Sequence, residues 1–110
     1  MLVGQNVRRV AIVGGARIPF ARAMGAYAEC SNQDMLTAAL QGVVDKFRLA
    51  GERLGDVGAG AVLKHPRDFN LTREAVLSSG LAPETPAFDL QRACGTSLET
   101  AIIVGMKIAL

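Results

Sequence analysis

The segment 98–110 constrains the fold most, because it predicts a helix that is apolar on every side. Between Leu98 and Leu110 only Glu99 and Lys107 are charged. A helix without a polar face needs cover all round, and the remaining chain offers too few elements to provide it. The sequence also stops inside this helix without a cap or a glycine. We therefore expect residues 1–110 to be the front part of a larger domain, completed by further chain, a partner subunit, or both.

Apolar runs and helical periodicity alternate along the chain, which predicts a layered α/β fold with a parallel sheet. Asn70 is expected to cap a short helix that Gly80 stops. A longer helix is expected to follow a capping box made by Ser31 and Asp34, and to end at Gly51. The expected strands cover residues 10–13, 57–63 and 87–90, and the expected helices cover 31–51, 71–79 and 94–110.

Composition excludes several functional classes. Half of the 110 residues are apolar and 20% are charged, which indicates one ordered domain at most. The net charge of +2, with no tryptophan and no basic stripe, does not support nucleic-acid binding. Apolar runs stay below the ~18 residues of a membrane span. Polar and basic residues follow Met1-Leu2-Val3, so we expect no signal peptide and a cytoplasmic location.

Cysteine and histidine are too sparse for a metal site or a disulfide framework. Cys30 and Cys94 lie far apart, and His65 is the single histidine, so we expect no bound metal. His65 lies in a polar loop and is expected to be solvated. Cys30 precedes a helix cap and is expected to have no catalytic role. Gly14-Gly15 lacks the spacing of a dinucleotide-binding loop and is expected to form a turn at the end of a strand.

Cys94 is the candidate catalytic residue. The third strand is expected to run directly into a helix that begins Cys94-Gly95-Thr96-Ser97. The unpaired N–H groups and the positive dipole end of that helix favour a thiolate, the nucleophilic form of cysteine. An inert buried thiol is the common alternative, but the small neighbours leave room for a ligand. No second group in the sequence is evidently placed to act as its base.

Four segments together resemble the thiolase family, and in particular its fatty-acid-oxidation type. They carry the family's opening strand and Pro-Phe loop, its Gly-x-Val-Leu strand, the helix after it and the cysteine motif. These segments are residues 10–20, 60–63, 72–77 and 92–97. The resemblance implies an α-β-α-β-α layered fold with a mixed sheet and a buried central helix. Residues 1–110 would be the first part of the family's N-terminal domain.

The resemblance also implies an activity. Cys94 would accept an acyl group from a 3-ketoacyl-CoA as acetyl-CoA leaves, and coenzyme A would then remove the shortened acyl group, or the reaction would run in reverse as a Claisen condensation. The backbone N–H of Cys94 would donate to the oxyanion. Coenzyme A is thus a substrate, and no bound cofactor is implied. Copies would form a homodimer or tetramer through the strand Ala87–Leu90.

Departures from the family keep alternatives open. Gln91 stands where the family commonly has Asn, and Gly95-Thr96-Ser97 replaces Gly-Ser-Gly. The family's activating histidines, its second cysteine and its CoA-binding loop would lie beyond Leu110, so we expect these residues alone to be inactive. A thiolase-like ketoacyl synthase, a lipid carrier, and a non-catalytic fragment acting only in subunit association are the alternatives.

Overall fold

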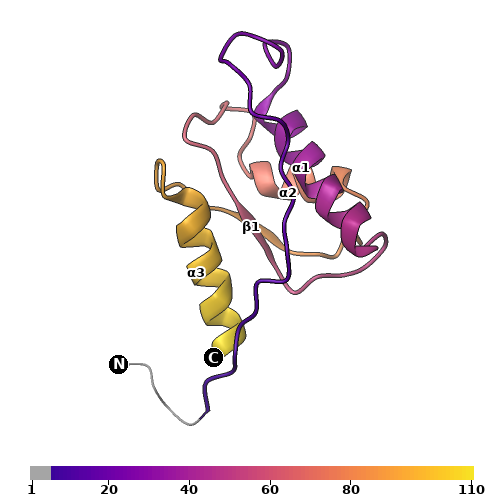
Figure 1. Cartoon of the computed structure of the whole chain (residues 1–110), viewed down its shortest axis with the longest axis vertical. Coiled ribbons are helices and arrows are strands. Elements are labelled where there is room, and N and C mark those ends of the chain that lie inside the picture. Colours follow the sequence, from indigo (N-terminus) through magenta and orange to yellow (C-terminus); the bar gives the residue numbers. More distant parts are fainter. Residues whose placement is uncertain (1–5) are drawn as a thin grey trace.

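The structure is a computed structural model that describes residues 6–110. It has a small sheet with two helices on one side and a third helix on the other (Figure 1). Strands β1 and β2 pair in parallel, with Val57 opposite Ala87 and Ala59 opposite Asp89. Helices α1 and α2 lie on one side of this pair, and α3 lies on the other. The elements are α1 (Asn32–Phe47), β1 (Val57–Ala59), α2 (Leu71–Ser78), β2 (Ala87–Asp89) and α3 (Thr96–Ala109).

Helix α1 begins as predicted and ends earlier than predicted. The Ser31 hydroxyl accepts from the Asp34 N–H at 3.1 Å, and the Asp34 carboxylate accepts from the Ser31 N–H at 2.8 Å. These two hydrogen bonds lower the pKa of Asp34, and the bond from the Ser31 backbone has the larger effect. Gly51 was expected to end this helix, but Arg48 does so in a left-handed conformation with φ of 55°.

Helix α2 provides the centre of the hydrophobic core. Its predicted cap is confirmed, since the Asn70 side-chain oxygen accepts from the Arg73 N–H at 2.9 Å. Val76 is fully buried and packs with Val44 of α1 and with Leu81. Partly buried apolar side chains from both helices, the loops and both strands surround these three; they are Leu40, Leu49, Leu54, Val57 and Ala87. The core therefore lies on one side of the sheet.

The predicted strand at residues 10–13 is wrong. This segment is extended but pairs with neither β1 nor β2, and Ile12 and Val13 are exposed. The segment runs between α3 and α1 instead (Figure 1). Gly14-Gly15 forms no turn there, and Gly14 lies against the ring of Phe47. An apolar run indicates burial, but a strand also needs a neighbour for its hydrogen bonds, and residues 6–110 offer this segment none.

The other two strands exist but are shorter than predicted. Strand β1 stops at Ala59 rather than Leu63, and β2 stops at Asp89 rather than Leu90. At Gly60 the backbone passes so close to the Leu90 carbonyl that any side chain would overlap it. The segments that follow β1 and β2 separate after this contact, and Val62 and Leu63 are exposed.

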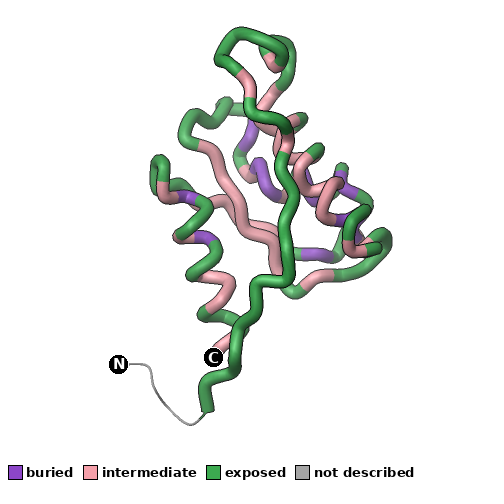
Figure 2. The backbone as a smooth tube through the Cα atoms, in the orientation of Figure 1, coloured by how far each residue is buried: buried purple, intermediate pink, exposed green. Residues whose placement is uncertain are grey.

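Helix α3 is covered on one side only (Figure 2). Thr96 and Thr100 are its buried residues, whereas Leu98 and Ile102 on other faces are 70% and 47% exposed. This agrees with the expectation that these elements cannot cover an apolar helix. Among residues 6–110 no helix is both long and apolar enough to cross a membrane. The residues Met1-Leu2-Val3, on which the signal-peptide prediction rests, lie outside the described part.

Candidate active site

A tight turn presents Cys94 between β2 and α3. The Gly95 N–H donates to the Arg92 carbonyl at 2.9 Å, which closes the turn over residues 92–95. Ala93 within this turn has a positive φ of 44°. A left-handed conformation costs a residue with a side chain about 1–2 kcal/mol, so the surrounding contacts must hold it. Cys94 is exposed and unpaired, which fits an accessible nucleophile better than an inert core thiol.

The predicted start of the last helix needs correction. Helix α3 begins at Thr96, Gly95 is its N-cap residue, and Cys94 therefore precedes the helix instead of opening it. The reason is the turn itself, because the closed loop over 92–95 delays the first helical hydrogen bond, from the Glu99 N–H to the Gly95 carbonyl at 2.9 Å. The thiol thus lies at the N-terminal end of α3, just before the first helical turn.

The Thr96 hydroxyl makes two hydrogen bonds to the backbone of this turn. It donates to the Ala93 carbonyl at 2.8 Å and accepts from the Arg92 N–H at 2.9 Å. The Thr96 N–H also approaches the Ala93 carbonyl, at 3.3 Å. Since Thr96 is only 8% exposed, water competes little for these bonds. One buried side chain therefore binds the backbone on both sides of Ala93.

Two glycines of the β1 region let α3 come close enough to position that side chain. A Cβ atom at Gly60 would lie 3.0 Å from the Thr96 methyl group, and one at Gly58 would lie 2.5 Å from the Thr100 methyl group. The threonine methyls therefore occupy the space that side chains would fill. The glycines' spacing of two, on one face of the strand, matches two threonines one helical turn apart.

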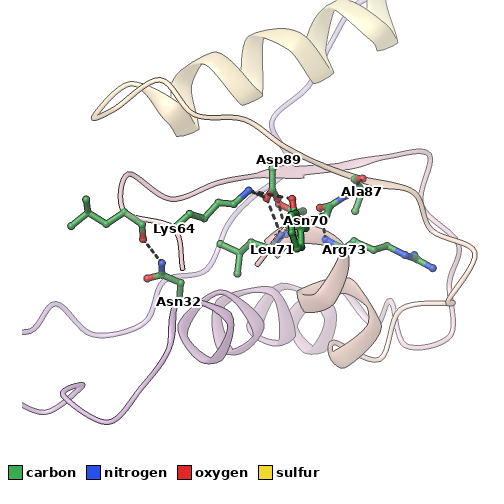
Figure 3. A network of polar contacts seen from close by, with 10 residues as sticks. Asn32, Lys64, Asn70, Leu71, Arg73, Ala87 and Asp89 are labelled. Atoms are coloured by element: carbon green, nitrogen blue, oxygen red, sulfur yellow. Dashed lines mark hydrogen bonds and ion pairs between the residues drawn. The ribbon is translucent and has the colours of Figure 1, made fainter. Parts of the chain in front are cut away.

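A polar network holds β2, the strand that leads to the turn, against α2 (Figure 3). The Asp89 carboxylate accepts from the N–H groups of Leu71 and Thr72 at 2.9 and 2.8 Å and pairs with the Lys64 ammonium. Partial burial acts to raise the pKa of Asp89, but the bonds from Lys64, Thr72 and Leu71 outweigh it and leave the pKa lowered. Asn70 adds a bond from its side-chain NH₂ to the Ala87 carbonyl.

The other sequence-predicted residues lie apart from Cys94. His65 lines a cavity of about 370 Å³ with Ser31 and Lys64, and no hydrogen bond joins it to the Cys94 thiol within residues 6–110. Cys30 is exposed beside a different cavity, against Tyr27 and Met35. No cluster of three potential metal ligands occurs in that same stretch. The described site therefore contains Cys94 as the candidate nucleophile, together with the backbone that supports it, and His65 makes no hydrogen bond to it.

Sequence reasoning missed Thr96 and Asp89 as parts of this site. A threonine after Cys-Gly is an unremarkable helix-start residue, and nothing in one sequence shows that its hydroxyl turns back toward Ala93. For Asp89 a signal did exist. An acidic residue at the end of a predicted strand suits the N-terminus of a neighbouring helix, and Asn70 marks the start of that helix.

Comparison with solved structures defines the class of fold. The chain superimposes on a crystal structure of the Bacillus anthracis acetyl-CoA acetyltransferase with a TM-score of 0.88 and 20% sequence identity. The match covers 97% of this chain and 27% of that one. The predicted thiolase-like α/β fold is thereby confirmed.

Sequence comparisons define the family. The model of the thiolase N-terminal domain matches residues 10–110. A 3-ketoacyl-CoA thiolase of Photorhabdus laumondii is 34% identical over 96% of this chain, and one of Vibrio cholerae is 33% identical over 91%. The chain belongs to the thiolase family, as the sequence motifs indicated. It spans about a quarter of the length of these relatives, 24% and 23% respectively.

Proposed function

We propose that this chain supplies the nucleophile of a thiolase-type acyltransferase, which cleaves a 3-ketoacyl-CoA with coenzyme A as co-substrate. The Cys94 thiolate attacks the 3-keto carbonyl, so that a carbon–sulfur bond forms. The bond between the α and β carbons then breaks, and its electron pair leaves on acetyl-CoA, whose α carbon takes up a proton. A second coenzyme A thiolate attacks the acyl-cysteine and releases the shortened acyl-CoA together with the Cys94 thiolate.

The observation that carries this proposal is the exposed Cys94 on a strained turn within a thiolase N-terminal domain match. The curated relatives carry the name 3-ketoacyl-CoA thiolase, and the solved structure is titled an acetyl-CoA acetyltransferase. Carbonyl addition also needs donors for the developing oxyanion. The Cys94 N–H fits this role, because no backbone hydrogen bond within residues 6–110 uses it.

The described residues supply only part of the machinery. Thiolysis needs a group that removes the thiol proton and one that protonates the leaving carbon. His65 makes no hydrogen bond to Cys94, so we propose that these groups come from chain or subunits other than residues 6–110. We accordingly propose that residues 1–110 alone do not turn over 3-ketoacyl-CoA. The Cys94 acylation half-reaction does not need that base at alkaline pH, where hydroxide removes the thiol proton.

Acylation by acetyl-CoA at alkaline pH tests the nucleophile. Peptide mass spectrometry of the chain should find the acetyl group on Cys94 at least about tenfold faster than on Cys30, since a positioned oxyanion donor is worth that much or more. Both cysteines are exposed, so Cys30 reports intrinsic thiol reactivity in the same molecule. Cys30→Ala should leave the fast reaction intact and Cys94→Ala should remove it. Equal rates at the two cysteines would overturn the assignment.

We further propose the setting in which this site operates. The chain is the front part of a thiolase N-terminal domain, which an intact mass of the natural polypeptide several times 11.6 kDa would support. Copies pair through the unpaired edge of the strand that includes Ala87–Asp89, because a free edge offers backbone hydrogen bonds. The exposed, unpaired thiols suit a reducing, cytoplasmic location.

A further inference from the structure

We propose that Thr96 is a positioning residue for acyl transfer, whose hydroxyl aims the Cys94 N–H at the oxyanion. The inference rests on the proposed function, since it assigns a role within the same reaction. It concerns a side chain that touches neither substrate nor thiol. Thr96 acts through the peptide group between Ala93 and Cys94.

The orientation of that peptide group follows from the bonds to its oxygen. The Ala93 carbonyl accepts from the Thr96 hydroxyl at 2.8 Å and from the Thr96 N–H at 3.3 Å, so it faces α3. In a planar trans peptide the carbonyl and the N–H point in opposite directions. The Cys94 N–H therefore points away from α3, and within residues 6–110 no backbone acceptor takes it.

The same hydroxyl also fixes the other end of the turn. It accepts from the Arg92 N–H at 2.9 Å, so one oxygen atom binds the backbone before and after Ala93. Ala93 keeps a positive φ of 44° between these two bonds. Loss of the hydroxyl would leave both backbone groups without this partner. The turn would then relax toward a negative φ at Ala93 and rotate the Cys94 N–H away from its present direction.

Two substitutions separate the hydroxyl from the methyl group. Thr96→Val keeps the shape that packs beside Gly60 and removes the hydroxyl, whereas Thr96→Ser keeps the hydroxyl and removes the methyl. Thr100→Val is the matched control. Thr100 is equally buried, its methyl lies against Gly58, and its hydroxyl donates to the Thr96 carbonyl within the helix rather than to the turn.

The experiment compares two reactions of Cys94 in the 110-residue chain. Acylation by acetyl-CoA passes through an oxyanion, whereas alkylation by iodoacetamide does not. Both rates are measured by mass spectrometry at the same alkaline pH and divided by those of Cys30. Thr96→Val should lower the ratio of acylation to alkylation at Cys94 by about tenfold or more. Thr96→Ser and Thr100→Val should keep it within about threefold.

The alternative outcomes separate this inference from the proposed function. An unchanged ratio in Thr96→Val, with fast acylation retained, would overturn the role of Thr96 and leave Cys94 as nucleophile. Equal loss of both reactions would show a merely structural effect and would also overturn it. If no cysteine of the chain is acylated, a measurement without substrate still tests the role of Thr96. The nuclear Overhauser effect between the amide and α protons of Ala93 is strong at positive φ and weak at negative φ, and a strong effect retained in Thr96→Val would refute the inference.

Discussion

Asp89 joins two parts of the molecule that are distant in sequence. Its carboxylate binds the first N–H groups of α2, from Leu71 and Thr72, and pairs with Lys64 after β1. Three positive or partly positive groups thus surround one acid at the end of β2. This arrangement lowers the pKa of Asp89 despite partial burial. The charge of Asp89 is therefore a source of stability that varies with pH.

Asp89→Asn should lower the free energy of unfolding at pH 7 by about 2 kcal/mol, the range for bonds to a charged group. Because the folded pKa lies below the unfolded value, this stability is present above the unfolded pKa and lost as pH falls through the folded pKa. Urea unfolding at low protein concentration should be repeated from pH 7 downward. The difference in free energy of unfolding between Asp89→Asn and the original chain should shrink as the pH falls.

The control is Asp45→Asn, which removes the same charge from an acid that meets the side-chain amide of Gln41 on α1. Its effect should stay within about 0.5 kcal/mol, as for ordinary surface changes. A gap between Asp89→Asn and the original chain that stays constant into strong acid would contradict the role given to the Asp89 charge.

At the scale of elements, the glycines near β1 set how closely α3 and β2 approach. Gly60→Ala would drive a methyl group into the Leu90 carbonyl, next to the bond from the Leu90 N–H to the Ala59 carbonyl. We expect a loss of about 3 kcal/mol or more in the free energy of unfolding, because backbone must move to relieve the overlap. Circular dichroism during urea unfolding measures this.

Gly55→Ala is the matched control, since a Cβ atom at Gly55 would meet nothing within 4 Å. Its φ also lies outside the left-handed range, so alanine is tolerated. We expect its stability to stay within about 1 kcal/mol of the original chain. Equal losses of unfolding free energy in the two variants would show that the close approach of Gly60 to Leu90 does not set the cost of Gly60→Ala.

Local patterns predicted the helices better than the strands. The start of helix α1 is predictable from Ser31 and Asp34, because their capping bonds join residues that are close in sequence. The segment 10–13 has an equally clear apolar pattern, but whether it joins a sheet depends on a partner strand elsewhere. The same division holds in the site. Cys94 is readable from its motif, whereas the reach of Thr96 back to Ala93 depends on a turn that one sequence does not reveal.

On the scale of the whole molecule, much apolar surface remains exposed. One side of α3 carries a row of such side chains, and the extended segment before α1 adds Ile12 and Val13. Large exposed apolar patches mark surfaces that another chain covers. The exposed apolar residues of α3 are Leu98, Ile102, Met106, Ile108 and the following Leu110.

The 110-residue chain should therefore self-associate as its concentration rises. Light scattering and sedimentation velocity at micromolar concentrations measure this. A double variant, Leu98→Gln with Ile102→Gln, should reduce association because it removes apolar surface from α3. Association that persists unchanged in this variant would favour the free edge of β2 as the contact. A monodisperse monomer would contradict both contacts.

Arg73 has a consequence for how the chain reaches this arrangement. Its guanidinium donates to the carbonyls of Thr85 and Pro83, both at 2.7 Å, and so ties α2 to the loop that enters β2. The unit from Val57 to Asp89 is continuous in sequence, so only local loops must close to form it, which limits the entropy cost of its closure. Helix α3 lies outside this unit and is tied to its start by the ion pair between Lys107 and Asp56. We therefore expect this unit to form before α3 docks against β1, so that the geometry around Cys94 depends on it.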